Sequence, residues 1–403
     1  MLRSTKVLTE RAILSHPAKP IALEFFAGGG LARLGLSAQF DVAWANDIDA
    51  MKCRAWRDNF GATGLVEGDI AAVQIEDLPT NPALAWASFP CQDLSLAGDR
   101  AGLTGGRSGT LFAFLARLAA LCDRGDPPEV VVLENVKGLL SSRGGQDLAA
   151  IFRALNELGY SAGCLEMDAA WFVPQSRPRI FIIAVRQSIQ IPVALLSHRD
   201  RPCVFQTPAI QKAQAALNTP VIDWYLPPPP ASPRDLDEIL DPTDGGWWNA
   251  TKLSNFQNQL SDSHRARLEA LLASPGRHIG TMYRRIRLEN GVKQQRAEIR
   301  FDGKVGCLRT PAGGSSRQFW LVVEHGDLKI RPINPRETMR LMGVPDTYVL
   351  PKSNLAGLKI AGDGVAVPVV AWLSGQLLGP LVTCARDTAP ACLKVKAHPR
   401  ELA

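Results

Sequence analysis

Short apolar runs alternate with longer amphipathic stretches through the first half of the chain. Continuous apolar runs rich in β-branched and aromatic residues are typical of strands buried on both faces of a sheet. Such runs predict strands at residues 21–26, 40–45, 66–70, 83–88, 129–135 and 179–185. Helical spacing of apolar residues predicts helices that start near residue 31 and that span residues 50–60, 109–122 and 147–159. Because strands and helices alternate from residue 20 to 186, we expect an α/β domain with a doubly wound, mostly parallel sheet.

This pattern ends near residue 190. From there to about residue 350 the chain is rich in proline and polar residues, and PPPPASP at residues 227–233 is a stiff spacer. We interpret this stretch as a second, smaller and less regular domain. Apolar residues return at 360–382 and predict a core helix that rejoins the first domain. The expected organisation is a first domain at 1–190, a second at 191–350, a return segment at 351–385 and a tail at 386–403.

The composition is that of an ordinary globular protein. Of its 403 residues 46% are hydrophobic and 21% are charged, which is unlike a disordered chain. The N-terminal segment has no uninterrupted apolar core of the kind that a signal peptide needs, and no apolar run reaches the ~20 residues of a bilayer span. We therefore expect a soluble, cytoplasmic protein. The eight cysteines are scattered without a C-x-x-C pair, so we expect neither a disulfide framework nor a metal site.

Positive charge is concentrated in one segment of the chain. The whole chain carries a net charge of +6, whereas residues 264–309 alone contain eleven Lys and Arg against four Asp and Glu. A concentration of this kind indicates a surface that binds a polyanion. The alternative is a solvated surface of arginines whose stems cover apolar atoms.

A glycine-rich loop follows the first predicted strand. Three consecutive glycines, Gly28, Gly29 and Gly30, let a ligand approach the backbone closely at the start of a helix. Arg33 stands where a dinucleotide-binding loop would have its third glycine, so we expect a single nucleoside-like cofactor.

Two acidic residues follow the next two strands. Asp47 would accept both hydroxyl groups of a ribose, and Asp69 would accept a hydrogen bond from an adenine amino group. Ile48 and Ile70 would cover the two faces of the adenine ring. Each feature alone is more often a structural turn, but three at successive strand ends favour a cofactor site.

Cys91 lies between Pro90 and Gln92, where an apolar strand meets a polar, glycine-rich loop. A thiol at the carboxyl edge of such a sheet can act as a nucleophile if positive charge lowers its pKa, and Arg177 or Arg179 could supply that charge. The alternative is a small buried hydrophobic residue, which is the commoner fate of a free cysteine.

Glu134 ends the fifth predicted strand and would reach the same edge. A thiol, a carboxylic acid and a guanidinium beside a nucleoside cofactor fit one demanding reaction. Carbon 5 of cytosine becomes nucleophilic when a thiolate adds at carbon 6, an acid binds ring nitrogen 3 and an arginine holds the 2-oxo group.

The chain resembles the S-adenosylmethionine-dependent DNA (cytosine-5) methyltransferases. The resemblance covers roughly residues 20–190 and 330–380 and lies in the order of nine short motifs. These motifs are 26–30 (FAGGG), Asp47, 68–70 (GDI), 89–92 (FPCQ), 107–111 (RSGTL), 134–136 (ENV), 175–179 (QSRPR), 331–346 and 362–368 (GDGVAVP). Asp47 replaces the usual Glu of the family, Leu31 a common Gly, and Asp363 a common Asn.

The resemblance implies a Rossmann-like methyltransferase sheet, S-adenosylmethionine as cofactor and S-adenosylhomocysteine as product. It implies a covalent Cys91 adduct, with Glu134 on the base, Arg179 on the 2-oxo group and Arg177 supporting the catalytic loop. Gln92 and Ser95 would close over a flipped-out cytosine. The implied cofactor-binding residues are Phe26 at the adenine, Gly28, Gly29, Gly30, Asp47, Ile48, Asp69, Ile70, Pro90, Leu111, Asp363 and Gly364.

The resemblance further implies that the second domain recognises double-stranded DNA, because it contains the basic segment. The residues expected to contact DNA, besides Ser95, are Arg284, Arg285, Arg287, Arg309, Ser315, Ser316 and Arg317. We expect a monomer that acts either with a cognate restriction endonuclease or as a solitary methylase, without a membrane partner.

Three other functions fit the sequence less well. A DNA-binding regulator without catalysis would not need the thiol, acid and arginine together. An RNA methyltransferase of the same family would carry a Cys-Phe-Thr phrase, which is absent from the sequence. A nicotinamide oxidoreductase would need a different glycine pattern.

Overall fold

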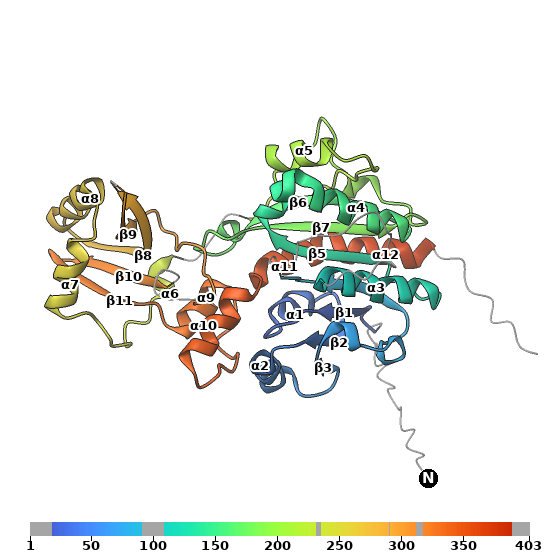
Figure 1. The fold of residues 1–403 in the computed structure, drawn as a ribbon, viewed down its shortest axis with the longest axis horizontal. Helices are drawn as coiled ribbons and strands as arrows, with labels where there is room; N and C mark the ends of the chain where they lie inside the picture. The colour runs from blue at the N-terminus through green and yellow to red at the C-terminus, as the bar shows by residue number, and fades with distance from the viewer. Residues whose placement is uncertain (1–17, 91–108, 231–234, 290, 312–316, 389–403) are drawn as a thin grey trace, which may run out of the picture.

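The computed structural model describes residues 18–90, 109–230, 235–289, 291–311 and 317–388 (Figure 1). A large α/β body and a smaller lobe lie side by side along the long axis of the molecule. The chain builds most of the body first, forms the lobe, and returns to the body with its last helices.

The body contains a seven-stranded sheet in the order β3-β2-β1-β4-β5-β7-β6. Within this sheet, β7 runs antiparallel to both of its neighbours, β5 and β6, and all the other described strand pairs are parallel. The strands are β1 (Ile21–Phe25), β2 (Asp41–Asp47), β3 (Leu65–Glu67), β4 (Pro82–Ala87), β5 (Val130–Val136), β6 (Tyr160–Asp168) and β7 (Pro178–Arg186). The expected fold class, a doubly wound and mostly parallel sheet, is confirmed.

Helices cover both faces of this sheet. One apolar core joins the sheet to α1 (Leu31–Leu36), α11 (Val367–Leu373) and α12 (Gly379–Thr388). A second core joins the other face to α3 (Thr110–Asp123) and α4 (Gln146–Glu157). The helix α2 (Ala50–Phe60) begins where the Asp49 carboxylate accepts hydrogen bonds from two backbone amides, and it spans the residues predicted from its apolar spacing.

The sequence prediction differs from the structure at two strands. Residues 68–70 are not part of a strand: β3 ends at Glu67, and Asp69 caps a 3-10 turn at Ile70–Ala72. The strand β6 was not predicted, because its residues are not continuously apolar. It packs closely against residues 221–224, where a side chain at Gly163 would overlap the Ile222 carbonyl oxygen.

The smaller lobe contains a four-stranded antiparallel sheet in the order β11-β10-β8-β9. Its strands are β8 (Arg277–Glu289), β9 (Val292–Arg300), β10 (Gln318–Glu324) and β11 (Asp327–Pro332). The helices α7 (Ala250–Gln257) and α8 (Asp262–Ala273) bury Phe256 and Leu268 against it. This lobe is more regular than the proline-rich sequence suggests, because only β10 carries a continuous apolar run, whereas the long strands β8 and β9 are exposed over much of their length.

The helix α5 (Pro208–Ala215) packs on the body beside β6. Shorter helices between the body and the lobe are α6 (Leu236–Ile239), α9 (Pro335–Leu341) and α10 (Asn354–Asp363) (Figure 1). Residues 354–387 are apolar enough and long enough to cross a membrane, but 61% of the most apolar window is buried inside the protein. This burial is typical of a core helix in a globular protein.

Candidate active site

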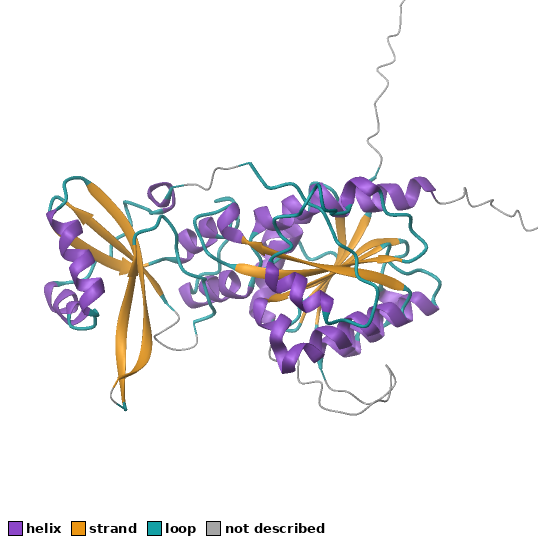
Figure 2. Ribbon diagram, turned by 90° about the horizontal axis from the view of Figure 1, so that it is seen from above, coloured by secondary structure: helices purple, strands orange, loops and turns teal. Residues whose placement is uncertain are grey.

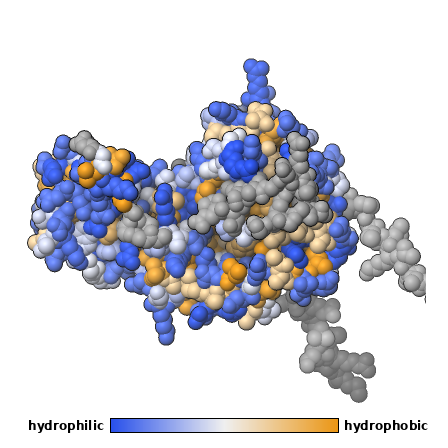
Figure 3. All heavy atoms as spheres, in the orientation of Figure 1, coloured by the Kyte–Doolittle hydropathy of each residue, from blue (hydrophilic) through white to orange (hydrophobic). Residues whose placement is uncertain are grey.

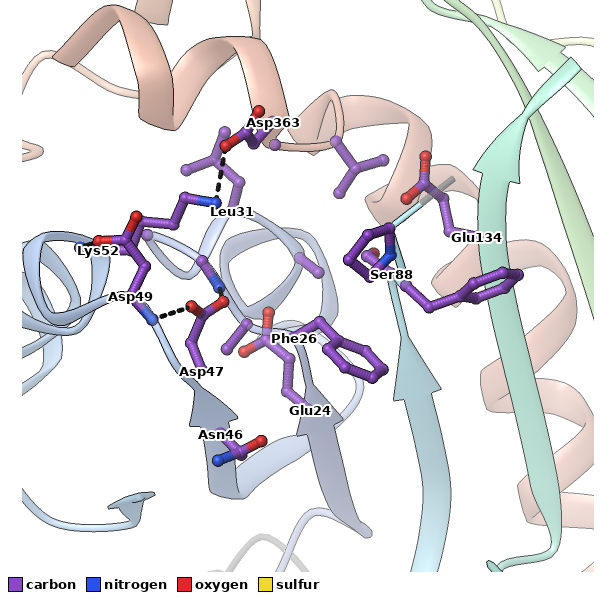
Figure 4. A pocket seen from close by; sticks show the side chains of 18 of the residues that line it. Glu24, Phe26, Leu31, Asn46, Asp47, Asp49, Lys52, Ser88, Glu134 and Asp363 are labelled. Atoms are coloured by element: carbon purple, nitrogen blue, oxygen red, sulfur yellow. Dashed lines mark hydrogen bonds and ion pairs between the residues drawn. The ribbon is translucent and has the colours of Figure 1, made fainter. Parts of the chain in front are cut away.

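A cavity of about 530 Å³ opens at the edge of the sheet where the parallel strands end (Figure 4). Its size lies within the roughly 300–1,000 Å³ of small-molecule sites. It sits beside the switch in strand order between β1 and β4, where doubly wound folds bind ligands. The walls come from the loop after β1, the ends of β2 and β5, residues 68–70 and 88–90, and residues 360–365.

The glycine loop forms the floor of the cavity. Gly28 and Gly30 have positive φ angles of 57° and 78°, which favour glycine, and Phe26 also has a positive φ of 59°. A side chain at Gly29 would overlap Ile360 and Tyr348, whose hydroxyl donates to the Gly29 carbonyl at 2.8 Å. Phe26, Gly28 and Gly29 line the cavity, whereas Gly30 turns the chain into α1.

Asp47 holds this loop against β2. One carboxylate oxygen accepts from the Gly28 amide and the other from the Asp49 amide, each at 2.8 Å (Figure 4). The side chain lines the cavity and is mostly buried, so each oxygen has only its remaining lone pair for a ligand. The structure therefore gives Asp47 a structural task in addition to the ribose contact that we predicted.

Three predicted adenine contacts lie together at one end of the cavity. Ile48 is 71% exposed, Ile70 is buried against the core, and both line the cavity beside Asp69. One Asp69 oxygen accepts from the Ala71 amide at 2.9 Å. Leu111, by contrast, is buried in the core, and its neighbour Thr110 forms the wall instead.

Glu134 lies at the other end of the cavity (Figure 4), where it contacts Arg179. The antiparallel strand β7 starts where β5 ends, so Arg179 lies opposite Val136 and its Nε is 3.2 Å from Glu134 Oε1. Both side chains are mostly buried and still border the cavity. An acid and a guanidinium fixed side by side in this way can bind the edge of a planar polar ring.

Asn135 connects this end of the cavity to the chain that leads to Cys91. Its Nδ2 donates to the Phe89 carbonyl at 2.9 Å, and Pro90 lines the cavity. Cys91 itself, together with Gln92 and Ser95, lies outside the described residues. Among the described cysteines, Cys53 and Cys164 are buried, and burial raises the pKa of both thiols, that of Cys53 to about 11, so these thiols are poor nucleophiles.

Arg177 does not line the cavity but joins three segments around it. Its guanidinium donates to the Leu308 carbonyl at 2.6 Å and to the Gly362 and Gly364 carbonyls at 2.8 and 2.6 Å. It is 2% exposed, and burial, with the nearby Arg179, lowers its pKa to about 10. Arg177 therefore connects the segment between the lobe strands β9 and β10 to residues 362–364, which we call the glycine turn of the cavity.

An ion pair that we did not predict spans one wall of the cavity. Lys52 Nζ lies 2.7 Å from Asp363 Oδ2, and Thr310 donates to the other oxygen of Asp363 (Figure 4). Burial lowers the pKa of Lys52, but the hydrogen bond to Asp363 and the negative charges of Asp363, Asp47 and Asp49 together outweigh this and raise the pKa above its usual value. Gly364 lines the cavity beside this pair. The signal for this ion pair in the sequence was Asp363, which stands where Asn is common and therefore adds a negative charge that needs a cationic partner.

Glu24 is a second residue that we did not predict. It lies in the interior of β1, lines the cavity and is 1% exposed. One carboxylate oxygen accepts from the Arg33 amide at 3.3 Å, and the other has no partner among the described residues. Burial raises the pKa of Glu24 to about 8 despite the nearby Arg33. The sequence signal was a carboxylate within an otherwise apolar strand.

We predict that Glu24→Gln makes the unliganded protein less sensitive to pH. A raised carboxyl pKa contributes stability that is complete below the unfolded value of 4.5 and is lost as the pH rises toward 8. Gln cannot ionise, so the variant does not lose this stability. The difference between the melting temperature of the variant and that of the wild type should therefore increase, in favour of the variant, from pH 5 to pH 8. The limit is about 1.4 kcal/mol for each unit of pKa difference.

Thermal unfolding at a series of pH values measures this difference. Glu76→Gln is the control, because Glu76 is exposed and lies outside the cavity. Parallel curves for Glu24→Gln and the wild type would contradict the prediction.

The predicted DNA contacts occupy the smaller lobe and its junction with the body. Arg285, Arg309 and Arg317 are exposed. Arg284 instead packs over the rings of Trp248 and Phe319, and Arg287 pairs with Glu298 at 2.6 Å. Ser315 and Ser316 lie outside the described residues.

The family described as C-5 cytosine-specific DNA methylase matches residues 22–378. The chain is 29% identical over 355 residues to the type II methyltransferase M.HhaI of Haemophilus parahaemolyticus, covering 87% of this chain and 92% of that protein. It is 27% identical over 353 residues to the type II methyltransferase M.Bsp6I of Bacillus sp. (strain RFL6), covering 86% and 94%.

Among solved structures, the fold is similar to that of the S. pombe Dnmt2 methyltransferase. The TM-score is 0.56 at 17% identity, and the match covers 90% of this chain and 99% of that one. At this identity the likeness concerns the fold alone.

Proposed function

Because the chain belongs to the C-5 cytosine-specific DNA methylase family, we propose that it transfers a methyl group from S-adenosylmethionine to carbon 5 of a cytosine flipped out of duplex DNA. The observation that carries this proposal is the Glu134–Arg179 pair at one end of a cavity whose other end suits a nucleoside. Pro90, the residue before Cys91, also lines that cavity.

The residues of the cavity fit S-adenosylmethionine. Carboxylates at Asp47 and Asp69 suit hydroxyl and amino donors, and the exposed Ile48 offers an apolar face to an adenine. The unpartnered oxygen of Glu24 suits a cationic group in the amino acid part of the cofactor. When bound there, the cofactor would supply an electrophilic methyl group.

The protein side chains would do the remaining chemistry. The Cys91 thiolate adds to carbon 6, while Glu134 binds nitrogen 3 and the exocyclic amine and Arg179 holds the 2-oxo group. Carbon 5 takes the methyl group and then loses its proton. The electron pair left behind re-forms the 5,6 double bond, and the carbon–sulfur bond breaks to free Cys91. Gln92 and Ser95 would close over the base and exclude water.

The lobe would recognise the DNA sequence. We propose residues 191–350 as the target-recognition domain and residues 351–385 as the segment that completes the catalytic domain. Arg285, Arg309 and Arg317 suit DNA best among the predicted arginines, because they are exposed and, unlike Arg287, have no ion-pair partner among the described residues. We propose a cytoplasmic monomer that binds DNA at the nucleoid, either beside a cognate restriction endonuclease or alone.

Methyl acceptor assays test the proposed function. Labelled S-adenosylmethionine is mixed with the protein and either duplex DNA or transfer RNA, and bisulfite sequencing of the DNA then locates the modified cytosines. We expect label in DNA at one short sequence. Label in RNA alone would refute the proposal.

We predict that Glu134→Gln lowers kcat by roughly 10²–10⁴-fold, the usual contribution of a positioned acid. Gln keeps the shape of the side chain but cannot give a proton to ring nitrogen 3. Single-turnover methylation measures the effect. The control is Glu129→Gln, because Glu129 stands just before the opposite end of the same strand and outside the cavity. Equal rates for Glu134→Gln and the wild type would remove Glu134 from the mechanism.

A further inference from the structure

The strands β8 and β9 continue beyond the sheet of the lobe as a two-stranded ribbon. β10 pairs with β8 only from Arg277 to Tyr283, whereas β9 pairs with β8 to Glu289. Beyond Tyr283, β8 therefore has β9 as its only strand neighbour among the described residues. Figure 2 shows the ribbon projecting away from the lobe. We call residues 284–289 with 292–297 the arm.

One face of the arm is apolar at its exposed end. Ile286 and Leu288 alternate with arginines, so they point to the same face, and they are 60% and 71% exposed. Gln295 and Lys293 lie opposite them on β9. Figure 3 shows apolar side chains at this end of the lobe among hydrophilic surroundings. An exposed apolar pair on a projecting ribbon is unfavourable in water and indicates a contact surface.

The other face of the arm carries the ion pairs that cross between its strands, together with Val292, which is 58% exposed at the end of the arm. Arg287 pairs with Glu298, and Arg296 pairs with Glu289, so two ion pairs cross between the strands. Arg285 lies on this face opposite Arg296 and has no acidic partner among the described residues. A lone two-stranded ribbon is marginally stable in water, and these two ion pairs add contacts between its strands.

The shape and charge of the arm fit duplex DNA. The major groove admits a two-stranded β-ribbon, and thymine exposes its methyl group only in that groove. Arg285 and Lys293 carry charge that the ion pairs do not neutralise, so they suit the phosphates on the groove walls.

Resting on the proposed function, we propose that the arm enters the major groove beside the target cytosine. Ile286 and Leu288 contact thymine methyl groups there, and Arg285 and Lys293 contact phosphates. The arm thereby adds a preference for A·T pairs that flank the methylated site.

Ile286→Ser/Leu288→Ser tests this inference, with Val193→Ser as the control because Val193 is 75% exposed on the body. Binding to duplexes that carry the methylated site is compared for thymine and for uracil, which lacks the methyl group. The wild type should lose about fourfold in affinity for each contacted methyl. The double variant should bind the thymine duplex about tenfold more weakly and be insensitive to uracil.

Arg285→Ala and Lys293→Ala give a second measurement that does not depend on the apolar pair. Each should reduce the slope of log affinity against log salt by about 0.9. Sedimentation of the wild type and the double variant tests a second copy of the chain as the partner of the arm. A dimer that Ile286→Ser/Leu288→Ser converts to monomers with unchanged DNA binding would overturn the inference.

The outcomes separate this inference from the proposed function. A wild type that methylates DNA but gives the same affinity for thymine and uracil duplexes would overturn the role of the arm alone. A wild type that methylates no DNA would overturn both. Uracil sensitivity lost only in the double variant, with S-adenosylhomocysteine affinity unchanged, supports the inference.

Discussion

Cys91→Ser is expected to abolish methyl transfer while leaving the binding of S-adenosylhomocysteine unchanged. A serine hydroxyl is a far weaker nucleophile than a thiolate, so the adduct at carbon 6 would not form. Loss of a nucleophile lowers rates by roughly three orders of magnitude or more. Incorporation of labelled methyl groups into duplex DNA measures the effect. Cofactor binding should survive because the described cavity is lined by other residues.

DNA containing 5-fluorocytosine gives a direct readout of the adduct. Fluorine cannot leave carbon 5 as a proton does, so the wild type should stay bonded to the base and migrate with the DNA under denaturing conditions. Cys91→Ser should give no such band. Cys122→Ser is the control, because Cys122 lies on α3 outside the cavity and its thiol pKa is raised by burial. Methylation by Cys91→Ser at the wild-type rate would refute the proposed mechanism.

Arg177→Met should both destabilise the protein and weaken its binding of S-adenosylhomocysteine. The substitution removes a buried guanidinium and leaves the Leu308, Gly362 and Gly364 carbonyls without their donor. Lost hydrogen bonds to a charged group cost about 1.5–3 kcal/mol each and are not additive, so we expect roughly 3–5 kcal/mol in the free energy of unfolding. Chemical denaturation and calorimetric titration measure the two effects.

The conservative variant separates charge from shape at this position. Arg177→Lys keeps the charge, but one ammonium group cannot match the fork of a guanidinium that reaches three carbonyls, so it should recover only part of the stability. Arg186→Met, at the opposite end of β7, is the control. An Arg177→Met protein with wild-type stability and affinity would show that the lobe and the glycine turn are held together by other contacts.

The sequence predicted the body of the protein better than the lobe. The strands around Leu23, Trp86 and Val132 are buried on both faces, so their apolar runs are continuous and easy to identify. β6 was missed because Glu166 and Gly163 interrupt its pattern, although residues 221–224 bury it. The sheet of the lobe was not predicted, because the second half of β8 and the first half of β9 are exposed to solvent. Arginines and other polar residues replace apolar residues there.

The candidate site was predicted in part. The glycine loop, Asp47, Asp69 and Glu134 were placed at one edge because parallel strands all end there, and the structure puts all of them around one cavity. Glu24 was not predicted, although a carboxylate within an otherwise apolar strand was a signal for it. Lys52 was missed because a lysine on an amphipathic helix is normally a surface residue.

The sequence by itself determined which elements form and the order in which the motifs follow one another, because hydrophobic spacing and turn residues act over a few neighbouring positions. Only the tertiary structure decided which polar groups share a partner. Arg177 bonds to Gly362 across 185 residues of chain, and Lys52 meets Asp363 from a distant helix. Such pairs form only when separate segments pack together, so no local pattern in the chain specifies them.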